Sequence, residues 1–460
     1  MGREIVVYSP TAILGYGFPR ESAEKAARIG VDYVGVDGGS TDPGPYYLGS
    51  GENFASYSGM VRDLKVLLEV FGVEGVPLLI GSAGGGGSRR HVELTLKGLA
   101  EASDGKRLTV AVIYSDVTPG RLRKLAGEGR IVGPADPGAP EFRLERALNS
   151  VVVAQQGLEP FIEALRLWEP DVVVAGRSVD AAPFAAPLVV EGVNRGVAVL
   201  AGKILECGAL AADPPAGSDG LLAFVGVDYV RLASPSPSRR VTIASVAEHS
   251  LYERADPFRE VLPGGYADLS RVEYVDLGGE VLARGAFWVE AERYLVKLEG
   301  AERVGYRYVM VAGSTDPGFI ERLDLIFREV EGEVLRRHPR ARLYLRVYGR
   351  DGVMGSSTPW KSPLREVGLL LESIAPSREE ARDALALARS MLMHWGWRGR
   401  KSTGGNLAFP LSPSEAYAGE AYRWSVWHLA ELREPLELAS IELLELSGGR
   451  YTRVEVAGGG

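Results

Sequence analysis

The sequence has few of the residues that would point to disulfides, metal clusters, secretion or a membrane. It contains one cysteine, Cys207, which excludes an internal disulfide and leaves no cluster of thiolate ligands. No uninterrupted apolar run is long enough to span a bilayer. The N-terminus enters a strand pattern without the basic and apolar segments of a secretion signal. We therefore expect a cytoplasmic protein that does not enter a membrane.

An excess of positive charge is also missing. The formal net charge is −8, which argues against nucleic acid as a partner, because such binders need a positive face. Hydrophobic residues make up 46% and charged residues 24% of the chain, a composition typical of globular proteins. Because 460 residues exceed the usual size of one core, we predict two domains, with one large elaborated domain as the alternative.

The first half of the chain alternates short apolar runs with amphipathic stretches. The apolar runs are residues 4–8, 32–36, 76–80, 108–114 and 171–175, and helical patterns cover residues 59–71 and 89–101. Runs that are apolar at consecutive positions suit strands covered on both faces, and the spacers are long enough to cross over. This pattern predicts an α/β fold with a mainly parallel, doubly wound sheet.

The second half differs from the first in its proline- and serine-rich segments and in its hydrophobic pattern. Residues 213–220 and 234–239 are rich in proline and serine, so we place an α/β (Rossmann-like) domain at 1–235 and a mixed α+β domain at 236–460. In the second domain the patterns predict hairpins around Gly278–Gly279 and Gly448–Gly449, a strand at 342–347, and helices at 317–338 and 377–395.

The hexapeptide GSTDPG occurs twice, at Gly39–Gly44 and at Gly313–Gly318. A helical pattern follows the second copy, so we predict that Asp316 caps a helix whose first turn accepts a proline. The first copy continues without helical periodicity to about Gly59, which predicts a ligand-binding loop, with a rigid structural loop as the alternative. Duplication and convergence on a good turn explain the repeat equally well.

Polar and glycine-rich residues follow the predicted parallel strands. In open parallel sheets the carboxyl ends of the strands line one crevice, where ligands bind. We therefore expect Asp37, Arg89 and Arg177 to meet at one rim of the sheet. The residues at these strand ends are Asp37, Gly81–Ser88, Ser115–Asp116 and Gly176–Asp180.

The glycine-rich turn predicts an anion site. Four consecutive glycines allow backbone N–H groups to approach an anion, and a helix that begins near Ser88 adds partial positive charge. We predict that Gly85, Gly86, Ser88 and Arg89 bind a phosphate or carboxylate, with a flexible loop as an equal alternative. The turn lacks both a P-loop ending and a strict G-x-G-x-x-G, so it predicts no nucleotide site.

Arg177 and Asp180 lie in the next turn. Arg177 could grip a carboxylate with two parallel hydrogen bonds. We expect Asp180 to cap the following helix, with orientation of Arg177 or metal binding as alternatives. Further along, His249 and Glu253 share a helical face, but no H-E-x-x-H pattern occurs and we interpret this histidine as structural.

Cations gather in two stretches of the second half, at 345–355 and 394–415. We predict that Arg350, Arg400 and Asn406 bind an acidic organic substrate or the phosphates of coenzyme A, with a solvated basic loop as the alternative. The candidate proton-transfer residues are Asp37, Asp42 and His394. The cofactor is not determined by the sequence; Mg²⁺ is a candidate metal, at Asp37, Asp42 and Asp180.

Several stretches resemble the acyclic terpene utilisation (AtuA-like) proteins, over nearly the whole chain: DGGSTDPGPYYLGSG, GRSVDAA, LECGALA, SVAEHSLYERADP, YGRDGVMG and HWGWRGRKSTGGNLAFPLSPSE. The resemblance implies a role in bacterial catabolism of citronellol- and geraniol-type terpenes, beside enzymes of branched acyl-CoA thioesters. Some relatives carry or accompany a small C-terminal domain, so a separate small partner subunit is expected. The resemblance supplies no catalytic residues.

Together these observations favour an enzyme of lyase or hydratase type that acts on a branched or hydroxylated carboxylic acid or its CoA thioester. The alternative is a non-catalytic subunit that binds acyl-CoA or organises a partner enzyme. A Ser-His-Asp hydrolase is not favoured, because the chain has no G-x-S-x-G signal. We also expect a homo-oligomer.

Overall fold

The chain forms two compact units in a computed structural model. The first unit comprises Met1–Glu302 and Trp424–Gly460, and the second comprises Arg303–Arg423. The structure describes residues 3–72, 75–251, 254, 256–352, 366–400 and 404–457. Among these residues, no helix combines the length and the apolar character that crossing a membrane requires.

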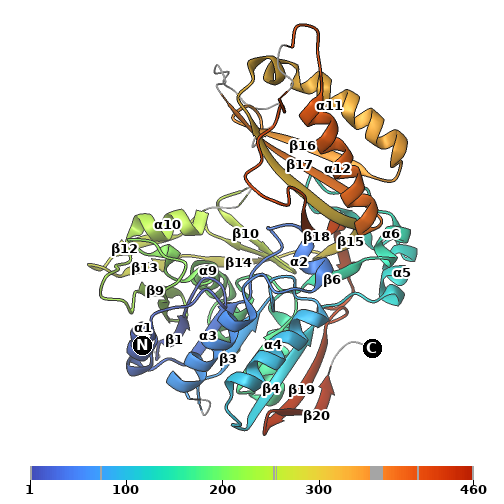
Figure 1. The fold of residues 1–460 in the computed structure, drawn as a ribbon. Helices are drawn as coiled ribbons and strands as arrows, with labels where there is room; N and C mark the ends of the chain where they lie inside the picture. The colour runs from blue at the N-terminus through green and yellow to red at the C-terminus, as the bar shows by residue number, and fades with distance from the viewer. Residues whose placement is uncertain are drawn as a thin grey trace. The chain divides into compact units, whose positions relative to one another are not determined.

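A mixed sheet with a parallel centre organises the first unit (Figure 1). Its central strands are, in spatial order, β1 (Ile5–Ser9), β2 (Tyr33–Asp37), β3 (Leu78–Gly81), β7 (Val172–Ala175) and β4 (Leu108–Tyr114). Neighbours within this set all run parallel. The α/β fold and the parallel core predicted for the first half of the chain are therefore confirmed.

Each central strand is buried on both faces. Val172 and Val174 belong to one apolar core, whereas Val173 and Ala175 belong to the core on the other side. One core is covered by α1 (Arg20–Ile29), α3 (Tyr57–Val70) and α4 (Arg89–Ala102), and the other by α7 (Glu159–Trp168), α8 (Ala182–Val190) and α9 (Arg195–Leu205). With both faces covered, the strand ends are where polar groups can gather.

Antiparallel strands extend the sheet on both sides. Beyond β1 lie β8 (Leu221–Val225), β9 (Tyr229–Ala233), β13 (Val281–Arg284) and β12 (Glu273–Asp276), and beyond β4 lie β19 (Ser440–Ser447) and β20 (Arg450–Ala457). The predicted hairpins β12–β13 and β19–β20 are confirmed. Because both hairpins extend the large sheet, the two units do not follow the sequence boundary at 235–236.

Shorter elements complete the first unit. A small antiparallel sheet consists of β10 (Arg259–Leu262), β11 (Gly265–Asp268) and β14 (Phe287–Glu290). The other short elements are α2 (Pro45–Ser50), α5 (Pro119–Gly127), β5 (Ile131–Pro134), α6 (Leu144–Leu148), β6 (Val151–Gln155), η1 (Gly208–Ala211) and α10 (Ile243–Leu251).

The second unit has an antiparallel sheet with helices packed on it. The strands β16 (Arg342–Tyr348), β17 (Val367–Ala375) and the latter part of β15 (Tyr294–Ser314) pair in that order. The helices α11 (Pro317–Arg337) and α12 (Arg378–His394) share an apolar core with these strands. β15 and β18 (Ala416–Leu432) carry the chain between the units. The second, antiparallel part expected in the C-terminal half is confirmed.

The two GSTDPG copies begin different structures. Asp316 caps α11, because its carboxylate accepts a hydrogen bond from the Phe319 N–H at 3.1 Å, as predicted. The expectation that the first copy leads into a helix-free loop was wrong. Pro45 opens the short helix α2, since proline suits a first helical position, and α3 begins at Tyr57.

We predict that Asp316→Ala lowers the free energy of unfolding of the second unit by about 1 kcal/mol, the usual effect of a lost cap. The matched control is Asp42→Ala, which changes the equivalent residue of the first copy. Asp42 is exposed and accepts from the Ser40 hydroxyl, so its loss should cost much less. Urea unfolding and amide exchange in the first turn of α11 measure the difference. Equal effects would mean that the cap at Asp316 contributes little.

Candidate functional site

Polar side chains from separate strand ends meet in the first unit. Asp37 is the last residue of β2, Ser82 follows β3, and Arg177 and Asp180 lie between β7 and α8. A fifth residue, Glu299, comes from the part of β15 that pairs with β6. We call these five residues the ionic cluster. Backbone hydrogen bonds from Gly38 to Gly81 and from Ala83 to Ala175 hold the strand ends together.

Arg177 is the centre of the ionic cluster. Its Nε donates to Glu299 at 3.0 Å, and its Nη1 donates to Ser82 at 3.1 Å and to Asp180 at 3.2 Å. The side chains of Arg177 and Glu299 are 3% and 0% exposed. Burial lowers the pKa of Arg177, but the neighbouring carboxylates outweigh it and raise that pKa above its usual range. The guanidinium therefore stays charged.

The expected helix cap at Asp180 was wrong. The residue at the N-cap of α8 is Ala181, and no side chain bonds the first-turn amides there. The Asp180 carboxylate bonds the guanidinium of Arg177 instead, at 3.2 Å, in a charge-assisted bond that is stronger than a bond between neutral groups. This arrangement agrees with the alternative that Asp180 orients Arg177.

Asp37 is a buried carboxyl group with an unusual environment. It is 5% exposed, and its Oδ2 accepts from the Gly39 N–H at 3.1 Å. Its Oδ1 has no hydrogen-bond partner among the described residues. Burial raises the pKa of Asp37 well above its usual range, Asp180 raises it further, and Arg177 opposes the shift. A carboxyl group in this environment keeps its proton to a higher pH than an exposed aspartate does.

The glycine-rich turn packs directly against the turn that contains Arg177. Residues 81–88 are all buried, and the Gly87 carbonyl accepts from the Arg177 N–H at 3.1 Å. Gly87 has a φ of 62°, and a Cβ at this position would lie 2.1 Å from the Arg177 nitrogen. A residue with a side chain therefore does not fit here. Within the turn, the Gly85 N–H donates to the Ser82 carbonyl.

The start of α4 is occupied by the protein's own groups. The Arg89 N–H donates to Asp116 at 3.0 Å, and the Ser88 hydroxyl lies 2.7 Å from His91 Nδ1. The sequence interpretation missed His91, although its place three residues after a serine cap was a signal. Burial lowers the pKa of His91 to about 4. Anion binding by Gly85, Gly86, Ser88 and Arg89 stays a prediction.

Asp37 and Arg177 lie in the same cluster, as expected for parallel strand ends at one rim of the sheet, although β3 separates their strands β2 and β7. The side chain of Arg89 has a different environment from those of Asp37 and Arg177. Its guanidinium is exposed and lies over the Tyr114 ring, 3.8 Å from the ring centre. Asp42 is exposed and bonded to Ser40. Catalysis by Asp37 and Asp42, and Mg²⁺ binding by Asp37, Asp42 and Asp180, stay predictions.

The other predicted site residues belong to the second unit. Arg350 makes two hydrogen bonds to Asp324, at 2.7 and 3.2 Å. Arg400 and Asn406 both donate to the Trp395 carbonyl and thereby satisfy the end of α12, while the exposed His394 is its last residue. Residues 353–355 and 401–403 of these stretches lie outside the described residues. Substrate binding or proton transfer by the four residues stays a prediction.

The fold and the cluster define an α/β protein with a buried acidic group at the carboxyl ends of its parallel strands. Residues 55–215 match the family model for the acyclic terpene utilisation family protein AtuA. The matched region includes the glycine-rich turn, Arg177 and Asp180, and it confirms the resemblance over residues 55–215. No curated protein and no solved structure matches the chain.

Proposed function

We propose that the protein is an enzyme of acyclic terpene utilisation that adds or removes water on a branched or hydroxylated carboxylic acid or its CoA thioester. The family description supports the pathway. The observation that carries the reaction class is Asp37, a buried carboxyl group with a raised pKa and an unpartnered Oδ1 among the described residues.

The chemistry follows from that environment. A carboxylic acid with a raised pKa can protonate a leaving hydroxyl group, so that the carbon–oxygen bond breaks and water departs. In the reverse direction the carboxylate takes a proton from the attacking water. Asp180, which is partly exposed and bonded to Arg177, is suited to take the proton from the carbon next to the carbonyl group.

One observation favours the alternative of a non-catalytic acyl-CoA-binding or scaffold subunit. The arginines Arg177 and Arg350 are paired with the protein's own carboxylates, Glu299 and Asp324. A guanidinium engaged in this way has less capacity to bind a substrate carboxylate or phosphate. In this alternative the ionic cluster stabilises the fold and takes no part in chemistry.

The test is a panel of branched 3-hydroxy acids, their CoA thioesters and the matching unsaturated compounds. The purified protein is assayed with and without Mg²⁺, and water addition or loss is followed by mass spectrometry. We expect turnover of at least one thioester or acid, with little effect of the exposed control Asp104→Asn, a residue whose φ of 50° asparagine tolerates. If no panel member reacts under any condition, the scaffold alternative replaces this proposal.

A further inference from the structure

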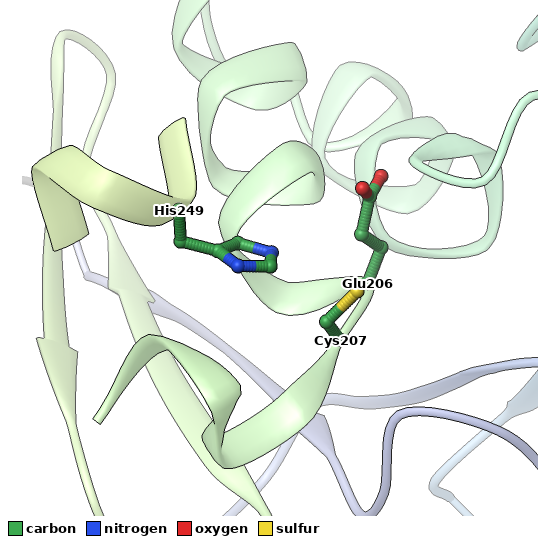
Figure 2. A group of neighbouring side chains, drawn as sticks. All are labelled: Glu206, Cys207 and His249. Carbon is green, nitrogen blue, oxygen red and sulfur yellow. The ribbon is translucent and has the colours of Figure 1, made fainter. Parts of the chain in front are cut away.

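Three side chains of different chemistry meet at the end of α9. Glu206 and Cys207 directly follow this helix, and His249 lies on α10, which packs against α9. One ligand atom from each residue lies within 4.8 Å of the other two. Glu206 and His249 are buried and Cys207 is partly buried. Figure 2 shows the His249 ring directed from α10 toward the chain segment that carries Glu206 and Cys207.

We propose that Glu206, Cys207 and His249 bind one divalent transition-metal ion of the zinc class. A thiolate, an imidazole and a carboxylate are the donors that Zn²⁺ takes in proteins, whereas Mg²⁺ and Ca²⁺ prefer oxygen donors. Zinc–ligand bonds of about 2.0–2.3 Å place tetrahedral donors roughly 3.5 Å apart, so the three side chains need only small movements. Three protein donors leave a fourth position for water or a ligand.

Charged groups of both signs surround the three side chains. Lys203 donates to Glu206 Oε1 at 2.6 Å. This bond orients the Glu206 carboxylate, as hydrogen bonds to metal ligands commonly do. The carboxylates of Asp180 and Glu260 are close enough to act electrostatically on Glu206. The cations that act on His249 are Lys203 and Arg254. With a metal bound, Glu206 bridges Lys203 and the ion.

This site goes beyond the proposed function and stands on its own geometry. It nevertheless lies near the ionic cluster, because Glu206 acts electrostatically on Asp37. Metal binding tests the site, and turnover tests the proposed function. A negative result in one measurement therefore does not decide the other.

Cobalt substitution of the full chain tests the proposal directly. The chain has a single cysteine, so a thiolate-to-cobalt charge-transfer band can come only from Cys207. We expect one Co²⁺ per chain, this band, a tetrahedral visible spectrum, and displacement of both by one equivalent of Zn²⁺. Zn²⁺ should also protect the thiol from a thiol reagent. A wild-type protein without the band, or without protection, overturns the proposal even if no variant folds.

Variants then identify the ligands. We expect Cys207→Ser to remove the band, and Glu206→Gln and His249→Gln each to weaken Zn²⁺ binding by more than the roughly 10- to 100-fold effect of an outer-shell change. The matched control is His338→Gln, which removes a histidine of the second unit and should leave the Zn²⁺ affinity unchanged. If His249→Gln binds Zn²⁺ as tightly as the wild type, His249 is not a ligand and the assignment fails.

Discussion

Arg177→Ala should lower the free energy of unfolding of the first unit by about 3–5 kcal/mol, the usual cost of breaking a buried ion pair. The change removes the guanidinium from Glu299, whose side chain is 0% exposed. Among the described residues, Glu299 then keeps its ion pair with Lys297, at 2.7 Å. Burial raises the pKa of Glu299. In the wild-type protein, Arg177 and Lys297 lower this pKa and outweigh the effect of burial. Without Arg177, the fold must hold a poorly compensated charge.

Urea unfolding of the first unit measures this effect, with Arg20→Ala as the matched control. Arg20 forms ion pairs with Glu24 and Glu69 on the surface, and such exposed pairs usually contribute little to stability. The double variant Arg177→Met with Glu299→Leu should recover much of the loss, because it removes the fully buried carboxylate of Glu299 and leaves only the partly exposed Lys297 and Asp180 without these partners. If Arg177→Ala costs no more than Arg20→Ala, the ionic cluster does not stabilise the fold.

The fold of the first half could be predicted because its signals are local. Each central strand is apolar at consecutive positions, and this pattern is what burial on both faces requires. The predicted strand at 108–114 coincides with β4, and the helix predicted from Arg89 is α4. The hairpins were also local signals. Their place at the edges of the large sheet depends on pairing between distant segments, such as β19 with β4, and no local pattern encodes it.

The candidate site could be predicted only in part, for the same reason. The rule that parallel strand ends converge was enough to bring Asp37 and Arg177 together. It could not supply Glu299, which lies 122 residues from Arg177 and engages its guanidinium. Nor could spacing reveal that Asp116 meets the start of α4, or that His249 faces Cys207. These partners are set by tertiary packing between elements.

Asp37→Asn should lower turnover by about 10²- to 10⁴-fold, the typical contribution of a general acid or base. At the same time, the variant should be as stable as the wild type at pH 7, or more stable. The folded state raises the pKa of Asp37, mainly through burial, so the charged form is disfavoured there. Asparagine has the same shape and no charge, and its side-chain oxygen can accept the bond from Gly39.

The raised pKa of Asp37 determines how its contribution to stability changes with pH. The unfolded aspartate loses its proton near pH 3.9, whereas the folded Asp37 keeps it to higher pH. The folded state therefore binds more protons above about pH 4, and the contribution of Asp37 to stability falls as the pH rises toward its folded pKa. Asp180 and Glu206 strengthen this trend, and Arg177 opposes it.

Urea unfolding at pH 4, 6 and 8 tests the prediction, with Asp104→Asn as the exposed control. The stability of Asp37→Asn relative to the wild type should increase from pH 4 to pH 8, whereas that of the control should stay nearly constant. A gain in stability together with a loss of turnover is what an acid held protonated for catalysis requires, because a group kept for the fold alone would stabilise it. If the variant is less stable than the wild type and the difference grows with pH, then Asp37 is ionised in the folded protein, and it cannot be the acid of the proposed reaction.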